Sequence, residues 1–150
     1  MTRTISEVLE ETVEAYGQRP AMRCKRDNGE WYDISWAEYR RDARNVAKAF
    51  IKLGVDAGAG VSIIGYNCSQ WFMADIGAIL AGCVPAGIYT TCSPEQCQYI
   101  THHCEAAIAF VENAEQLEKF KAVRSELPHL KALVMMEGDD ADEEGSWRRL

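Results

Sequence analysis

Two segments of the chain carry polar side chains that could hold a ligand directly after short apolar runs. They read GYNCSQW at residues 65–71 and GIYTTCSPE at residues 87–95. If the apolar runs are parallel strands, both segments lie at the carboxyl edge of one sheet, where α/β proteins bind ligands. Helices that begin after them add backbone N–H donors, so we expect an anionic or polar ligand. The candidate side chains are Asn67, Ser69, Tyr89, Thr90, Thr91 and Ser93, with helix capping as the alternative role, which fits Ser93 best.

A further segment, CSPEQCQYITHHC at residues 92–104, has the residue types of a metal site but not the spacing. On a helix, Cys97 and Cys104 share a face but stand about 10 Å apart along the axis. Zinc ligands lie about 2.3 Å from the ion. We therefore expect no metal and no disulfide, and we interpret all six cysteines as small apolar side chains in a reducing compartment. Cys97 and Cys104 are expected on a buried face together with Ile100.

Common catalytic and nucleotide-binding motifs do not occur in the sequence. There is no GxxxxGK[ST] loop, no GxSxG and no HExxH. The glycines of GAGVSIIG, at residues 58–65, precede a predicted strand, whereas a dinucleotide-binding loop follows one. The residues alone thus predict an α/β layer without catalytic machinery.

The elements that must position these residues follow a regular α/β order. Four apolar runs typical of buried strands begin 23, 23 and 25 residues apart. One strand and one crossover helix fit each interval, so the fold class is α/β, with a mostly parallel sheet of βαβ units and right-handed crossovers. The strands are expected at 61–66, 84–89, 107–111 and 132–136.

Helix signals and one turn signal complete the predicted order. The Asp-Asn-Gly sequence at 27–29 predicts a β-hairpin after an N-terminal amphipathic helix. A predicted helix at 70–81 is apolar almost all round, so we expect it to be buried in the body of the fold. Asn113 is expected to cap a helix whose apolar stripe continues to Leu127. Capping boxes pair Thr4 with Glu7, Ser35 with Glu38, and Ser93 with Gln96.

The charge distribution excludes some function classes. The net charge is −7, which argues against nucleic acid as a partner. Six of the 23 acidic residues fall at 137–144, and we interpret that run as a solvated loop or linker. The uncharged run 76–94 is about long enough to cross a bilayer, but Gly82, Pro85 and Gly87 interrupt it. We therefore predict no transmembrane span, and the N-terminus lacks the apolar region of a signal peptide.

These segments together resemble the N-terminal region of the adenylate-forming enzymes. ISWAEYRRDARNVAKAFIKLGV leads into VSIIGYNCSQWFMADIGAILAGCVPAGIYTTCSPEQCQYITHHCEAAIAFVE, and EQLEKFKAVRSELPHLKALV follows. Within that superfamily the chain is most similar to the bubblegum-type long-chain fatty acyl-CoA synthetases. Their corresponding stretch runs Gly-aromatic-Asn, an aromatic-rich helix, Gly-Ile-Tyr-Thr-Thr and a Ser-Pro-Glu helix start. The resemblance covers nearly the whole chain and fades after about residue 137.

The resemblance implies a ligase reaction in two steps. A long-chain fatty acid and ATP give an acyl-adenylate and diphosphate, with Mg²⁺ shielding phosphate charge, and the thiol of coenzyme A then displaces AMP. It also implies a cytoplasmic protein with peripheral contact to the endoplasmic reticulum or other membranes. For Tyr89, Thr90 and Thr91 it implies one wall of the coenzyme A channel, although Thr91 stands where some relatives have a basic residue. Trp71 and its helix are expected to pack in the core.

The family's catalytic parts do not occur in these 150 residues. They are a Ser/Thr/Gly-rich phosphate loop with a lysine, an acid and an arginine on the ribose, and a lid lysine. YTTCSPEQ, at 89–96, has hydroxyls but no glycine pair and no lysine. We expect residues 1–136 to be the N-terminal part of an AMP-binding domain and residues 137–150 a truncated acidic loop or linker. As a fragment, the chain is expected to bind no ATP, coenzyme A or Mg²⁺ and to be inactive.

Two alternatives remain open at this stage. One is a stand-alone α/β binding or interaction module that shares only the architecture. The other is a different acyl- or aryl-adenylating enzyme. The coding sequence after Leu150 separates the module from the synthetase, because only the synthetase continues into a phosphate loop.

Overall fold

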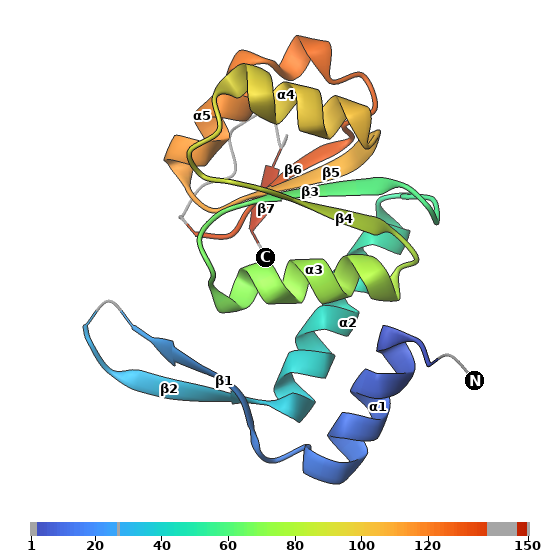
Figure 1. Cartoon of the computed structure of the whole chain (residues 1–150), viewed down its shortest axis with the longest axis vertical. Coiled ribbons are helices and arrows are strands. Elements are labelled where there is room, and N and C mark those ends of the chain that lie inside the picture. Colours follow the sequence, from blue (N-terminus) through green and yellow to red (C-terminus); the bar gives the residue numbers. More distant parts are fainter. Residues whose placement is uncertain (1–2, 27, 138–146, 150) are drawn as a thin grey trace.

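A computed structural model describes residues 3–26, 28–137 and 147–149. Within these residues an antiparallel hairpin and a five-stranded sheet in the order β4-β3-β5-β6-β7 form the β-structure (Figure 1). The helices are α1 (Ile5–Tyr16), α2 (Trp36–Lys52), α3 (Ser69–Leu80), α4 (Pro94–His103), α5 (Ala114–Ala122) and the 3₁₀ turn η1 (Arg124–Glu126). The strands are β1 (Pro20–Lys25), β2 (Trp31–Ser35), β3 (Gly60–Ile64), β4 (Val84–Ile88), β5 (Ala106–Val111), β6 (Ala132–Met135) and β7 (Trp147–Arg149).

The predicted parallel sheet is confirmed. All four runs that the sequence marked as strands lie in the larger sheet, and every neighbouring pair in it is parallel. The structure adds β7, which the sequence analysis did not predict and which pairs with β6 through Leu133 and Trp147. Residues 138–144 of the acidic run 137–144 lie outside the described residues.

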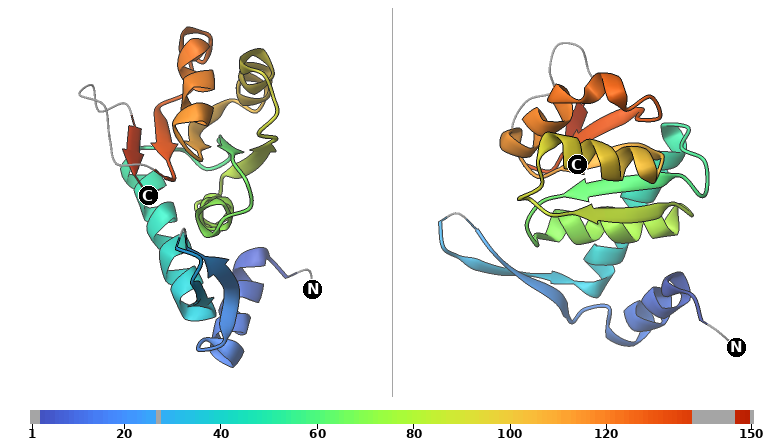
Figure 2. Two further views of the ribbon diagram at one scale, coloured as in Figure 1. Left: turned by 90° about the vertical axis from the view of Figure 1, so that its left-hand side faces the viewer. Right: turned by 45° about the horizontal axis from the view of Figure 1, so that its top comes forward.

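Helices cover both faces of the five-stranded sheet, so the core has two halves (Figures 1 and 2). α4 and α5 lie on one face, and α3 with part of α2 lies on the other. Successive side chains of a strand point to opposite faces. Accordingly, Ile63 and Phe110 pack in the α2/α3 half, whereas Ile64 and Val111 pack in the α4/α5 half.

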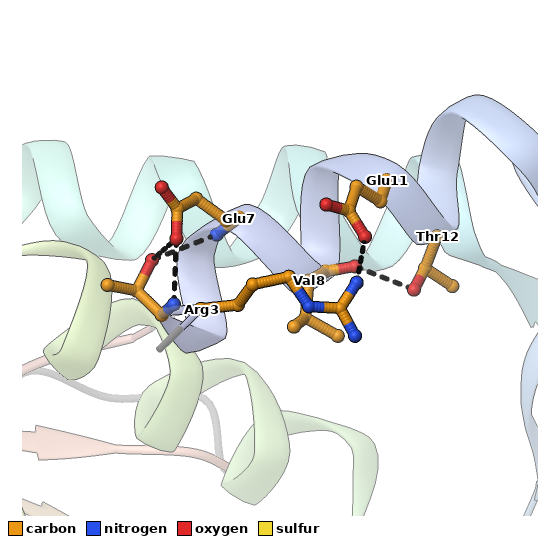
Figure 3. A network of polar contacts seen from close by, with 6 residues as sticks. Arg3, Glu7, Val8, Glu11 and Thr12 are labelled. Atoms are coloured by element: carbon orange, nitrogen blue, oxygen red, sulfur yellow. Dashed lines mark hydrogen bonds and ion pairs between the residues drawn. The ribbon is translucent and has the colours of Figure 1, made fainter. Parts of the chain in front are cut away.

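Side-chain caps begin four of the five α-helices, as the sequence predicted. Thr4, Ser35 and Ser93 each form a capping box, and Asn113 accepts a hydrogen bond from the backbone N–H of Gln116. Figure 3 shows the start of α1, where Glu7 accepts from the backbone N–H of Thr4 at 2.7 Å and the hydroxyl of Thr12 donates to the carbonyl of Val8. An Arg3–Glu11 ion pair runs along the first two turns of the same helix.

Two details of the helices differ from the sequence expectation. α5 ends at Ala122, and the chain reaches the buried Leu127 through η1 rather than through a further α-helical turn. α3 is not buried all round, because the sheet and α2 cover only part of its circumference, and Phe72 is 38% exposed. Among the described residues no helix combines the length and the hydropathy that a membrane span needs.

Candidate functional site

A pocket of about 440 Å³ opens at the carboxyl ends of β3 and β4. This is the edge of a parallel sheet at which the sequence placed a ligand. The end of β4 and the segments that follow the two strands line it, and the first turn of α3 adds one side chain. The lining residues are Gly65, Tyr66, Asn67, Trp71, Gly87, Ile88, Tyr89 and Thr90.

The structure brings three of the six candidate residues into this pocket. Asn67 lies on the β3 side, and Tyr89 and Thr90 lie on the β4 side. Thr91 is exposed on the same loop as Thr90 but does not line the pocket. Ser69 lines a second pocket, of about 480 Å³, between the start of α3 and the hairpin. Ser93 caps α4 by accepting from the backbone N–H of Gln96 at 3.3 Å.

Trp71 has a place in the pocket that the sequence analysis did not assign to it. The indole packs against the α2/α3 half of the core, as expected, and also forms part of the pocket wall. A Cβ added at Gly87 would lie 3.3 Å from the indole ring, so a glycine is what lets the ring lie close to β4. The signal available in the sequence was an aromatic residue in the first turn of a helix that follows a strand end.

Two charged side chains outside the pocket hold its walls. The ammonium group of Lys119, on α5, donates to the carbonyl oxygen of Thr90 at 2.6 Å. The carboxylate of Glu112, which follows β5, accepts from the backbone N–H of Tyr66 at 3.2 Å. Sequence reasoning missed both residues, because their partners lie 29 and 46 positions away and no local motif marks the contact.

Of the two ligand classes expected from the sequence, anionic or polar, the lining of the pocket favours a polar one. None of the described residues that line it carries a charge, and three of them are aromatic. Binding of a phosphate relies on cationic groups or several converging N–H donors. The lining instead offers rings and the amide and hydroxyl groups of Asn67, Tyr89 and Thr90, which suits an uncharged polar or planar part of a ligand.

The cysteines form no site of their own in the part of the chain that the structure describes. All six are free, and no group of three His, Cys, Asp or Glu side chains there could hold a metal ion. Cys97 is fully buried on α4, and burial raises the pKa of its thiol to about 11, which makes it a poor nucleophile. Cys104 ends α4 only partly buried, with its sulfur 3.6 Å from the carbonyl oxygen of Thr101.

Known proteins were compared with this chain in sequence and in structure. The family model described as "AMP-binding enzyme" matches residues 9–148. The long-chain-fatty-acid–CoA ligase ACSBG2 of Xenopus laevis is 46% identical over 131 residues, which cover 87% of this chain and 18% of that protein. The human long-chain-fatty-acid–CoA ligase ACSBG1 is 41% identical over 132 residues, which cover 88% of this chain and 18% of that protein.

The structural comparison agrees with the sequence comparison at the level of the fold. The anthranilate CoA ligase AuaEII, solved in complex with anthranoyl-AMP, superposes with a TM-score of 0.81 at 23% identity. The match covers 91% of this chain and 25% of that one. The present chain therefore spans about a fifth of the length of the curated relatives it matches. It belongs to the AMP-binding enzyme family, and over most of its length it is similar to the bubblegum-type long-chain-fatty-acid–CoA ligases.

Proposed function

We propose that the chain is the N-terminal part of the adenylating domain of a long-chain-fatty-acid–CoA ligase. The main support for this proposal is the 46% sequence identity to such a ligase over 87% of the chain. In the proposed reaction a long-chain fatty acid attacks the α-phosphate of ATP, which releases diphosphate and leaves an acyl-adenylate. The thiol of coenzyme A then attacks the acyl carbon, and AMP leaves. Mg²⁺ accompanies ATP, and its ligands would come from residues outside this chain.

Within that enzyme we propose that the loop after β4 forms one wall of the coenzyme A channel. Tyr89 is 84% exposed, and Tyr89 and Thr90 line a pocket at the ligand-binding edge of the sheet. A pocket of about 440 Å³ is too small to enclose a whole coenzyme, so its uncharged lining would contact an uncharged part of the molecule. Thr91, exposed beside it, would face the same channel.

The test compares the 150-residue chain with the full-length protein that contains it. The full-length protein is expected to catalyse fatty-acid-dependent ATP–diphosphate exchange and to form acyl-CoA. The chain alone is expected to show neither, because without a phosphate loop or a lid lysine it has no donors to stabilise charge at phosphorus. Exchange above background by the purified chain would contradict its inactivity. Absence of exchange in the full-length protein, tested with long-chain fatty acids, would contradict the ligase assignment.

We also propose a cytoplasmic location with peripheral membrane contact. The described part of the chain has no membrane-spanning helix, while the fatty acid substrate of the proposed reaction partitions into membranes. Fractionation of cells that express the full-length protein is expected to leave it in the soluble fraction or to release it from membranes with alkaline carbonate. Retention in the carbonate-washed membrane would contradict this location.

A further inference from the structure

The pocket at β3 and β4 is held from outside by two oppositely charged side chains of the neighbouring βα unit. Glu112 lies between β5 and α5, and Lys119 lies on α5. Neither side chain lines the pocket. Each one bonds a backbone atom of a different wall: Glu112 bonds the N–H of Tyr66, and Lys119 bonds the carbonyl of Thr90.

Both charged groups are at least partly buried, which argues that their hydrogen bonds to the two loops are not incidental. Glu112 is only 7% exposed and Lys119 is partly buried, so both side chains are shielded in part from water. A charge removed from water is costly unless strong hydrogen bonds compensate it. For Lys119 the carbonyl of Thr90 supplies such a bond at 2.6 Å, slightly shorter than the range of about 2.7–2.9 Å typical of a charged N–H donor.

The contacts also fix the relative position of the two walls. Both walls are loops that follow strands, and β3 pairs with β5 as well as with β4. Glu112 follows the last residue of β5, and its own N–H donates to the carbonyl of Ile64 at 2.9 Å, so β3 and the carboxylate are held together. Lys119 on α5 bonds the loop after β4. The β5–α5 unit thereby contacts both pocket-lining loops, although neither Glu112 nor Lys119 lines the pocket.

We propose that Glu112 and Lys119 are positioning residues that set the width of this pocket and hence the affinity for coenzyme A. This inference rests on the proposed function, in which the pocket forms a wall of the coenzyme A channel. The two side chains touch no substrate in this view. They act through the backbone of Tyr66 and Thr90.

The experiment uses the full-length protein with Glu112→Met and Lys119→Met, which keep the approximate shape of each side chain but remove the hydrogen bond. Each is expected to raise the KM for coenzyme A about tenfold, the effect of losing one charged hydrogen bond. The KM for fatty acid and the rate of ATP–diphosphate exchange should stay within about twofold, because adenylation precedes coenzyme binding. Lys119→Arg, which retains a cationic donor, should restore the KM, and Glu112→Gln, which retains an acceptor, should show a smaller rise.

The same helix offers a matched control pair. Glu118 and Lys121 form an exposed ion pair at 2.8 Å on α5, away from the pocket. Glu118→Met and Lys121→Met should leave all kinetic constants unchanged. Tyr89→Ala, which removes a proposed wall residue directly, provides the positive reference for a raised KM.

The outcomes separate this inference from the proposed function. No acyl-CoA formation by the unmodified full-length protein defeats the proposed function itself. If Tyr89→Ala raises the KM for coenzyme A and the two positioning variants do not, the positioning role is wrong. Equal losses in exchange and in thioester formation would indicate a merely structural role and also overturn it. Hydrogen–deuterium exchange gives a readout without activity: residues 66–68 and 89–93 should exchange faster in the positioning variants than in the controls.

Discussion

Asp75 shows how one residue can lower the stability of its own helix. It lies partly buried on the apolar helix α3, and no cation of the described residues pairs with it. Burial disfavours the charged form and raises the pKa of its carboxyl above the ordinary value of 3.8. Nearby, burial raises the pKa of Tyr39 to about 12, and the charge of Asp75 contributes to that rise. The Tyr39 hydroxyl donates to the carbonyl of Phe72 at 3.2 Å.

Asp75→Asn is therefore expected to stabilise the 150-residue chain at neutral pH by about 0.5–1 kcal/mol, a figure reduced for the solvent that still reaches the carboxylate. Because the pKa is raised in the folded state, the ionised carboxylate destabilises the fold by its full amount above that pKa. Below the pKa of the unfolded chain the carboxyl is protonated in both states, and the destabilisation is absent. The gain should shrink as the pH falls from 7 toward about 4. Urea unfolding at several pH values measures it, with Glu14→Gln, exposed on α1, as the control. A gain independent of pH would contradict this account.

Some residues of the candidate site can be predicted from the sequence, and others cannot. Asn67, Tyr89 and Thr90 were found from their place after apolar runs, because strand ends in a parallel sheet meet at one edge. Glu112 and Lys119 could not be found in this way. In the sequence, a glutamate and a lysine look the same whether they face solvent or a backbone atom of a distant loop.

At the scale of elements, the contact between α2 and α3 depends on a glycine. A Cβ at Gly77 would lie 2.7 Å from Cβ and Cγ1 of Val46 and 3.0 Å from the carbonyl oxygen of Ala43. Two of these atoms belong to a buried side chain and one to helix backbone, so α3 would have to move away from α2. Val46 also packs in the α2/α3 half of the core, so the shift would disturb the sheet face as well.

Gly77→Ala is expected to destabilise the chain by about 1–3 kcal/mol through overpacking. Val46→Ala alone should cost about 2 kcal/mol through the cavity it leaves. The double variant should cost about 0.5 kcal/mol less than the two single changes together, because Val46→Ala removes Cγ1, whereas the Cβ of residue 46 and the carbonyl oxygen of Ala43 stay close to the new methyl group. Denaturant unfolding of the four proteins measures the coupling. If the losses of stability are strictly additive, the contact between residues 46 and 77 does not limit how closely α2 and α3 pack.

The order of elements was predictable because helix caps, turn residues and apolar periodicity are local signals. The capping boxes at Thr4, Ser35 and Ser93 and the regular strand interval each specify an element without reference to distant residues. β7 was missed because it has only three residues and its pairing with β6 is a long-range contact. The end of α5 was misjudged because Leu127 continues the apolar spacing, although η1 brings it into the core.

At the scale of the whole molecule, the β4 edge of the five-stranded sheet has no further strand paired to it among the described residues. β4 lies at the end of the strand order and pairs only with β3 among the described residues, and Val84 on it is 57% exposed. Phe72 of α3 is also exposed, and it lines the second pocket, between the start of α3 and the hairpin. An unpaired strand edge next to apolar surface is a template for association between chains. The AMP-binding relatives are about five times longer, so further chain is available there to cover such surfaces.

The 150-residue chain alone is therefore expected to aggregate as its concentration rises, and Val84→Lys should raise the concentration at which this begins by placing a charge on the exposed edge strand. The net charge is −7, so an added lysine lowers its magnitude, and greater net repulsion between chains cannot explain an improvement. Ala122→Lys makes the same change of charge at an exposed position on α5 and should leave aggregation unchanged or slightly worse. Static light scattering at increasing protein concentration measures the onset. If Val84→Lys and the unmodified chain aggregate at the same concentration, association does not run through the β4 edge, and the exposed face of α3 becomes the surface to substitute next.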